Sequence, residues 1–474
     1  MQTKKQRKVF LIDILTDFSA KLADCGSLFQ AEQDILQWAM HLACEAMQGF
    51  LQGLDDQLFA ERSDNEQVLS RQSRTIDFCF GPVTFKRRVY CDEQGQSYFK
   101  LDRFFQIEHH KRLSPYLRLM MAEIGQVTTM RNTAQILGLV CPSSQVSANS
   151  VMTAVHQLGP QVAALNQQAE TQAVQRRVPA HLIIEGDAFM IKLKGMTKSG
   201  TQSLEIHHFR VYERMDGQPA HRHDFLGTSL VTVKERVINY LDTHYCLKGQ
   251  TIFLGSDAGP GYSPAEMLDL VPAQAHGEYV VDRYHCKRKI KTTLGPDNRF
   301  LNRAYQALRN HDYNGLMISL DTFESMGLSV KQQDNLDHLR AYLKRNWDYV
   351  PSPHDRGFEG FGHLGSVESS HRAFTYRMKK QGKSWTKLGA QAMLGLIEAR
   401  ANQNLDTSLA TVLKKITALS PQLTTSAAHQ ATFNLRSILR KAPVKQSCGA
   451  QPGRIVVNGP ASSPIGHLNK IFTE

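Results

Sequence analysis

The chain has 474 residues and a formal net charge of +12. This length exceeds what one hydrophobic core usually holds, so we expect two or more domains. Apolar residues make up 41% of the chain, a normal globular content that excludes wholesale disorder. The excess of lysine and arginine favours a polyanionic partner, with nucleic acid ahead of an anionic membrane surface.

The sequence carries no pattern typical of membrane insertion or secretion. No apolar run approaches the roughly 18 residues of a spanning helix, so we expect no membrane partner. Asp13 and Asp17 interrupt the short apolar run after the basic start, which argues against a signal peptide. The eight cysteines include no CxxC pair, which argues against a disulfide framework and a structural zinc site. We therefore expect a cytoplasmic protein that associates with the nucleoid.

Residues 1–70 predict an N-terminal helical region. Apolar side chains recur at helical spacing over residues 8–62, which predicts two or three amphipathic helices. These helices either pack within one subunit or form a module for dimerisation or DNA-end binding. The two stripes are Leu11, Ile14, Leu15, Phe18 and Leu22, then Ile35, Trp38, Ala39 and Leu42.

Residues 71–103 predict a β-meander. Strand-like runs at 75–80 and 83–90 are separated by Gly81-Pro82, and a turn follows at 92–95. The middle strand carries three adjacent cations, which either contact DNA phosphates or form a solvated edge that prevents aggregation. These cations are Lys86, Arg87 and Arg88.

Residues 104–177 predict a helix-turn-helix-like DNA-binding region. One helix ends near Leu137-Gly138, and a second begins near Ser147, where Ser147 or Asn149 can cap it. In a helix-turn-helix the second helix enters the major groove of DNA. The connection is long for this motif, so DNA reading and simple helix packing both stay open.

The central stretch of the chain is His181–Lys192, HLIIEGDAFMIK. A short apolar run that holds one acidic pair, Glu185 and Asp187, predicts a buried strand. Burying an unpaired carboxylate costs several kcal/mol, so these acids need a partner. A divalent metal is one such partner, and a turn at the end of the strand is the alternative for Asp187.

A second acid follows another strand. Thr251–Leu254 predicts a strand that ends near Asp257, and a turn at 259–261 leads into a helix at Ser263-Pro264. Glu278–Val281 predicts a further strand that ends at Asp282-Arg283-Tyr284-His285. Other segments predict strands at 203–214 and 225–233 and a helix at 234–247.

The remaining residues are mostly helical in pattern. Residues 293–355 predict an all-helical insertion, and helices follow at 366–378 and 385–402. Glu368 lies in the first turn of the former. Trp385 either stacks on a splayed base or belongs to the core. We assign no function to the tail at 416–474.

Asp187, Asp257 and Glu368 form a set suited to phosphodiester chemistry. Two divalent cations about 3.5–4 Å apart, held by such carboxylates, activate an attacking hydroxyl and stabilise the leaving oxygen. Oxygen ligands suit Mg²⁺ or Mn²⁺ rather than zinc. The spacing is compatible with an α/β ribonuclease-H-like catalytic core. Its first part would be 178–292 and its last part 356–415, separated by the helical insertion.

The chain resembles the ISLre-type insertion-sequence transposases, a DDE family of bacterial mobile elements, over nearly its whole length. The resemblance implies a ribonuclease-H-like core, two Mg²⁺ (or Mn²⁺) ions, and cleavage and joining of DNA at terminal inverted repeats. Coordinated cutting of two ends implies a homodimer or higher oligomer on DNA. The resemblance is carried by the stretches GPVTFKRRVY, TTMRNTAQILG, LIIEGDAFMIK, IFLGSDAGPGYSP, YVVDRYHCKRKI and LGSVESSHRAFTYRMKKQGKSWTKLGAQAM.

By this resemblance Asp187 and Asp257 match the two catalytic and metal-binding aspartates, and Glu368 matches the glutamate. Glu359, in a Gly-rich loop, competes for the third place. The residues after Asp257 depart from the expected Gly, small residue and aromatic, which leaves the geometry of that loop open.

Asp282–His285 resembles the DxxH motif of the related Mutator-like and hAT enzymes, in which the histidine lies close to the active site. A histidine bonded at a strand end is the alternative. We expect basic side chains near the acids to contact the DNA backbone, with solvated basic turns as the alternative. They are His285, Lys287, Arg288, Lys289, Arg372, Arg377, Lys379 and Lys380.

Two other functions fit the same residues. A metal-dependent nuclease with this fold would cleave DNA without joining it. A DNA-binding regulator, or a decayed transposase, would bind element ends without cleaving them. Inverted repeats and a short target duplication around the gene would favour the transposase.

Overall fold

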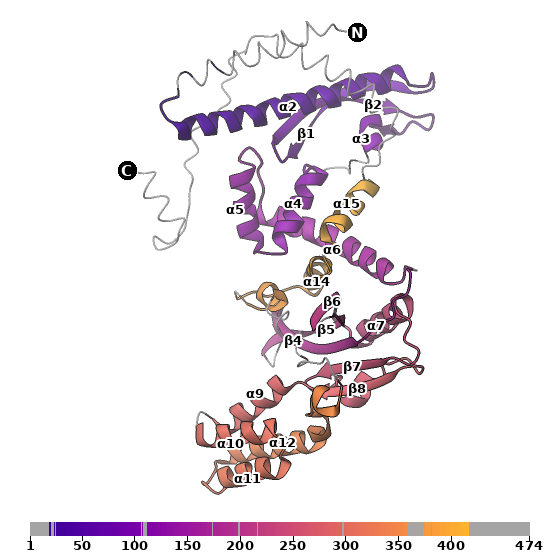
Figure 1. Ribbon diagram of the computed structural model, residues 1–474. Coiled ribbons are helices and arrows are strands. Elements are labelled where there is room, and N and C mark those ends of the chain that lie inside the picture. Colours follow the sequence, from indigo (N-terminus) through magenta and orange to yellow (C-terminus); the bar gives the residue numbers. More distant parts are fainter. Residues whose placement is uncertain are drawn as a thin grey trace. The chain divides into compact units, whose positions relative to one another are not determined.

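The computed structural model describes residues 19, 23, 25–105, 107, 111–172, 174–197, 200–215, 217–295, 298–358, 364, 373–380 and 382–416 (Figure 1). The described residues fall into two compact units. The first holds the described residues before 75 together with 84–101, and the second holds 75–83 and the described residues from 102 onwards.

The first unit contains one long helix, α2 (Leu28–Ala60). Ser27 caps α2 by accepting a hydrogen bond from the Gln30 amide. The second half of α2 buries Leu51, Leu54 and Leu58. We expected two or three helices over 8–62. The described part of this region contains α2, and Ser19 and Ala23, which precede it, are also helical. The first apolar stripe lies outside the described residues.

A three-stranded sheet follows α2, as the β-meander pattern predicted. Its strands, in the order β1-β2-β3, are β1 (Gln67–Phe78), β2 (Gly81–Cys91) and β3 (Ser97–Tyr98). The short helix α3 (Lys100–Phe105) comes next. Within the first unit, side chains of α2 bond to the backbone of β2, for example from Gln48 to Thr84 and from Gln52 to Lys86.

The helices of the predicted helix-turn-helix region are α4 (Pro115–Gly125), α5 (Met130–Val140) and α6 (Ala148–Glu170). Ser147 caps α6, as predicted, by accepting a hydrogen bond from the Ser150 amide. The first half of α6 packs against α4 and α5 through one apolar cluster. Its second half crosses α14 (Lys387–Ala401), where the backbones touch: a Cβ added at Gly159 would lie 2.2 Å from the Ala392 carbonyl oxygen. These helices therefore belong to the same compact unit as the large sheet.

The large sheet has the strand order β6-β5-β4-β7-β8. Strands β4, β5 and β6 are antiparallel neighbours, whereas β7 runs parallel to β4 and β8 parallel to β7. The strands are β4 (Leu182–Thr197), β5 (Gly200–Met215), β6 (Gln218–Gly227), β7 (Thr251–Ser256) and β8 (His276–Val281).

Two strand predictions need correction. The strand through Asp187 does not end near Lys192, because β4 continues to Thr197 as the partner of β5. The strand predicted at 225–233 is instead the end of β6, and α7 (Leu230–His244) begins after it. The reason is that the Ser229 side chain accepts a hydrogen bond from the Thr232 amide and so caps a helix at this point.

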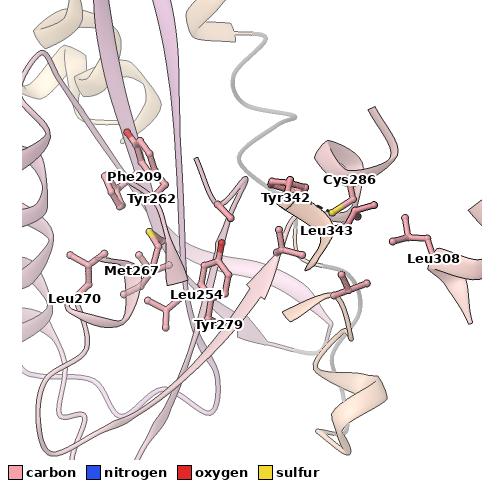
Figure 2. Packing of buried hydrophobic residues seen from close by; sticks show 14 of the residues in the cluster. Phe209, Leu254, Tyr262, Met267, Leu270, Tyr279, Cys286, Leu308, Tyr342 and Leu343 are labelled. Carbon is pink, nitrogen blue, oxygen red and sulfur yellow. Dashed lines mark hydrogen bonds between the residues drawn. The ribbon is translucent and has the colours of Figure 1, made fainter. Parts of the chain in front are cut away.

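The alternation of β4 side chains separates two cores. Leu182 and Ile184 face a cluster that includes Phe209 of β5 and residues of α7 and α9. Figure 2 shows part of this cluster, with Phe209 and with Cys286 of α9. Phe189 and Ile191 face the opposite way, toward α6 and α14. Both faces of the sheet are therefore covered, which explains the nearly continuous apolar runs in its strands.

The described part of 293–355 is mostly helical, as its sequence pattern predicted. It contains three helices, α10 (Asn298–Arg309), α11 (Tyr313–Glu324) and α12 (Val330–Asn346). Other elements are α8 (Pro264–Leu268), α9 (Arg283–Leu294), the 3-10 turns η1 (Trp347–Tyr349) and η2 (His354–Arg356), a helical segment at 373–378, and α15 (Leu405–Ile416). Among the described helices, none is long and apolar enough to cross a membrane.

Candidate active site

Three aspartates lie at the same level of three adjacent parallel strands. The register pairs Glu185 of β4 with Gly255 of β7, which aligns Asp187 with Asp257 two residues further along. The pairing of Ser256 with Val281 aligns Asp257 with Asp282 at the end of β8. Asp187 lies within β4, but at the point where β4 loses its parallel neighbour. The carboxyl ends of β7 and β8 and the middle of β4 therefore present their acids together.

Asp187 is held between closely packed neighbours. Its carboxylate accepts a hydrogen bond of 2.7 Å from the Ala188 amide. Gly186 leaves no room for a side chain, because an added Cβ would lie 2.8 Å from the Phe209 ring and 3.1 Å from the Tyr262 ring. The cross-strand partner of Asp187 is His208, which is fully buried. The backbone that carries Asp187 is thus fixed on both sides.

Asp257 is oriented by its own loop and by the helical insertion. The Gly259 amide donates a 2.8 Å hydrogen bond to Oδ1 of Asp257. Tyr342 of α12 donates a 3.0 Å hydrogen bond to the Asp257 backbone carbonyl. Ala258 has a φ of 56°, a left-handed conformation that non-glycine residues rarely adopt. The unexpected sequence after Asp257 is therefore accommodated by a strained residue rather than by glycine.

The acids open into a cleft of about 1130 Å³. Asp187 and Asp257 line it together with one face of α9, one face of α12 and the residues around 375–380. On α9 and α12 the lining residues recur at helical spacing. They are His285, Arg288, Lys289, Thr292 and Thr293 from α9, Asn335, His338, Leu339 and Tyr342 from α12, and Thr375, Lys379 and Lys380.

A much smaller pocket of about 20 Å³ lies among the acids themselves. Asp187, Asp257, Asp282 and His285 line it, together with the buried Glu185. The Glu185 carboxylate adds to the effect of burial in raising the pKa of Tyr212 above its ordinary value. A pocket of this size matches one water molecule or ion rather than an organic ligand.

Five of the predicted DNA-binding residues line the cleft: His285, Arg288, Lys289, Lys379 and Lys380. Lys287 is exposed on α9 but is not among the lining residues. His285 lies near the start of α9, 3.9 Å from the Asp282 carboxylate, and it lines the small pocket among the acids. Most of the cations that the sequence analysis placed near the acids therefore line the same cleft as Asp187 and Asp257.

Three of the arginines predicted to contact phosphates are buried, make internal contacts and do not line the cleft. Arg377 is 3% exposed and donates two hydrogen bonds, of 2.9 and 2.8 Å, to the Gly125 carbonyl. In the first unit, Arg88 is 5% exposed and pairs with Asp55, while Arg87 is buried with its guanidinium 3.4 Å from the Phe99 ring centroid. Internal contacts occupy these guanidinium groups, so only Lys86 of that cluster is exposed.

Trp385 belongs to the core. It is 7% exposed, and its indole nitrogen donates a 2.8 Å hydrogen bond to the Met378 carbonyl. The alternative of a base-stacking residue is therefore excluded in this arrangement.

Glu368, its competitor Glu359 and Arg372 lie outside the described residues. Two described residues that flank Glu368 in the sequence, Leu364 and Phe374, lie close to the site. Leu364 lines the small pocket among the acids. The Phe374 ring lies 4.9 Å from the ring of His208, the cross-strand partner of Asp187.

Within the described residues, no group of three or more histidine, cysteine, aspartate or glutamate side chains is arranged to hold a metal ion. Asp187 and Asp257 nevertheless supply carboxylate oxygens to the same small pocket, and oxygen donors suit Mg²⁺ and Mn²⁺. The described residues thus fit part of a divalent-cation site.

Comparisons with known proteins give a family, one protein of similar sequence and one solved structure with weak similarity. A family model with the description "Uncharacterised protein family (UPF0236)" matches residues 23–412. The "UPF0236 protein in vanSb 3'region" of Streptococcus gallolyticus is 27% identical over an alignment of 469 residues that covers 96% of this chain and 99% of that protein. The solved "Drosophila P element transposase strand transfer complex" is 10% identical over 69% of this chain and 91% of its own, with a TM-score of 0.25. That score is too low to carry an argument about the fold.

Proposed function

We propose that this protein, which belongs to the UPF0236 family, is a DNA transposase that cuts at terminal inverted repeats and joins the ends to target DNA. The observation that carries the proposal is the placement of Asp187 and Asp257 at one level of adjacent parallel strands, where they line a cleft together with several cations. A polyanionic substrate is held by such cations, while paired carboxylates suit the cleavage of its phosphodiester bonds.

We also propose that the large sheet is a ribonuclease-H-like core with the helices α10, α11 and α12 as its insertion. Three antiparallel strands followed by two parallel ones, with acids on β4 and at the end of β7, support this assignment. The resemblance of the sequence to ISLre-type transposases supports it independently of the strand order.

Asp187, Asp257 and a third acid would hold two Mg²⁺ or Mn²⁺ ions. Such ions, when bound, activate an attacking hydroxyl and stabilise the leaving oxygen of an in-line displacement. Glu368 is our first choice for the third acid, because the described residues on either side of it, Leu364 and Phe374, contact the acid pocket and His208. Glu359 and Asp282 compete with Glu368 for the third place. Asp282 is included because the strand register aligns it with Asp257.

The protein's own residues position the acids and the DNA. The Gly259 amide fixes one oxygen of Asp257 and so presets the direction of the carboxylate. The cations of α9 and of residues 379–380 neutralise phosphates on either side of the scissile bond. Hydrolysis would expose a 3′-hydroxyl, and this hydroxyl would attack target DNA with inversion at phosphorus. Because two ends must be cut and joined together, at least two copies would act on one element.

The test is Mg²⁺-dependent cleavage and joining of labelled element-end DNA in the presence of target DNA. The transposase should release 3′-hydroxyl ends and join them to the target. Cleavage without joining, and without preference for the repeats, would instead establish the nuclease. Tight binding to the ends with neither reaction would leave the regulator or decayed transposase.

The third acid is assigned in the same assay. Glu368→Gln should abolish cleavage and joining while DNA affinity is kept, whereas Glu359→Gln and Asp282→Asn should retain both reactions. Loss of activity in Glu359→Gln or Asp282→Asn, with activity kept in Glu368→Gln, would move the third place to that residue.

A further inference from the structure

A second pocket of about 590 Å³ is lined by four arginines and one carboxylate. It shares no lining residue with the cleft that holds Asp187 and Asp257. Its arginines come from four different elements, namely Arg210 from β5, Arg222 from β6, Arg377 from the segment at 373–378 and Arg400 from α14. The carboxylate belongs to Asp224 of β6.

Asp224 neutralises only one of these arginines. The Arg210 guanidinium donates hydrogen bonds of 2.7 and 2.9 Å to the two carboxylate oxygens of Asp224. His208 contacts the same carboxylate at 2.7 Å. Burial alone would raise the pKa of Asp224, but the bonds from His208 and Arg210 outweigh it and hold that pKa well below its usual range. This carboxylate is therefore fully engaged.

Arg377 is a buried cation without an anionic partner in the part of the chain that the structure describes. Its acceptor is the neutral Gly125 carbonyl, and its guanidinium lies 4.9 Å from the Trp385 ring centroid. Burial lowers the pKa of Arg377 to about 10, as expected when no nearby carboxylate compensates the desolvated charge. A buried charge of this kind is stabilised strongly by an anion.

The other two arginines are exposed and also lack a carboxylate among the described residues. Arg400 donates a 3.3 Å hydrogen bond to the side-chain amide oxygen of Gln126. Arg222 is exposed and forms no ion pair with any residue that the structure describes. The pocket thus presents three cations that no described acid neutralises. Apart from Gln126, its remaining walls are aromatic or apolar. Tyr376, which is 51% exposed, offers a ring that a base can stack on.

We propose that this arginine pocket binds a phosphate group, and that in the working protein the phosphate belongs to a nucleic-acid strand that leaves the cleft. The segment at 373–380 connects the two sites, because Thr375, Lys379 and Lys380 line the cleft while Tyr376 and Arg377 line the pocket. The identity of the strand rests on the proposed function, whereas phosphate binding itself does not.

The test substitutes the two exposed arginines of the pocket, because their replacement should not disturb folding. Arg222→Gln/Arg400→Gln removes two positive charges from the pocket. Arg303→Gln/Arg309→Gln is the matched control, since it removes two exposed arginines of α10 that line neither site. Affinity for a labelled DNA duplex is measured in EDTA at several salt concentrations, so catalysis plays no part in the readout.

The pocket variant should bind DNA less tightly, and the slope of log affinity against log salt should fall by about 1.8, or about 0.9 for each lost phosphate contact. The control should keep the slope of the wild type. A second measurement asks whether 10 mM inorganic phosphate raises the melting temperature of the wild type but not of the pocket variant.

A changed DNA slope assigns the pocket to the strand, and protection by phosphate without a changed slope assigns it to a free phosphate compound. Equal slopes for pocket variant and control, with no protection by phosphate, would overturn the proposal. Failure of the cleavage assay would remove the transposase assignment and leave these binding results standing.

Discussion

The Tyr342 hydroxyl of α12 donates a 3.0 Å hydrogen bond to the backbone carbonyl of Asp257. Tyr342 is buried, and its hydroxyl also lies 3.8 Å from the Cys286 sulfur (Figure 2). The bond ties the helical insertion to the loop that carries a proposed catalytic acid. It acts beside Ala258, whose left-handed backbone needs such support.

Tyr342→Phe should therefore lower the rate of DNA cleavage while leaving DNA affinity unchanged. The lost hydrogen bond should also reduce the free energy of unfolding by about 1 kcal/mol. Tyr305→Phe is the matched control, because that hydroxyl donates to the Lys287 carbonyl, away from the acids. Single-turnover cleavage that slows equally in both variants would mean that Tyr342 has only a structural role.

Gly186→Ala should destabilise the protein by about 1–3 kcal/mol, the usual range for overpacking. The added methyl would press against the Phe209 and Tyr262 rings. Gly138→Ala provides the opposite expectation, since nothing lies within 4 Å of the added atom and Gly138 is within α5. Alanine there should stabilise by up to about 1 kcal/mol through its helix propensity. Urea unfolding measures both, and a harmless Gly186→Ala would contradict the packing described for Asp187.

Arg236 joins three helices through a buried ion network. Its guanidinium pairs with Glu170 of α6, at 2.9 Å from Nε, and with Glu398 of α14, at 2.7 Å. Arg236→Leu should cost about 3–5 kcal/mol of unfolding free energy, because both carboxylates would stay buried without their cation. Arg340→Leu removes a comparable but exposed pairing with Asp321 and Glu324 and should cost about 0–1 kcal/mol. Similar losses in the two variants would argue against the buried network.

Glu66 should make the first unit sensitive to acid. Burial alone would raise its pKa, but hydrogen bonds from Lys100 and Tyr98 outweigh this and lower the pKa from 4.5 to about 2. A lowered pKa means that the stabilisation is complete above pH 4.5 and is lost as the pH falls toward 2. The wild type should therefore be more stable than Glu66→Gln at pH 7, and the difference should vanish between pH 4.5 and 2.

Urea unfolding at several pH values measures this difference. Glu32→Gln, a change at an exposed position of α2, serves as the control for net charge. A gap between wild type and Glu66→Gln that stays constant down to pH 2 would contradict the assigned cause.

Much of the core could be predicted from local pattern. Apolar runs indicated β4, β7 and β8, and serine caps indicated the starts of α6 and α8, because these signals depend on neighbouring residues. The same runs placed Asp187 and Asp257 on two different strands, but the pairing of β4 with β7 that aligns them could not be read from these runs. The length of β4 could not be predicted, because its end depends on pairing with β5. The residues of both strands are mostly polar there, so no apolar run marks them as strands.

Burial of the predicted DNA contacts could not be read from the sequence. Arg88 and Arg377 resemble surface cations until Asp55 and the Gly125 carbonyl are brought to them by residues far away in the chain. Likewise, nothing local marked Asn335, His338 and Tyr342 as cleft residues. Only their spacing along one face of α12, together with the packing of that helix near Asp257, assigns them to the site.

The most direct test of the account is cleavage of element-end DNA by Asp187→Asn and Asp257→Asn, with DNA affinity measured in parallel. Asp242→Asn, at an exposed position of α7, is the control for loss of one carboxylate. We expect both active-site variants to lose Mg²⁺-dependent cleavage by at least 100-fold, on the order expected when a catalytic group is removed, while affinity and the control stay at wild-type levels. Cleavage that persists in either Asp187→Asn or Asp257→Asn would contradict the central claim.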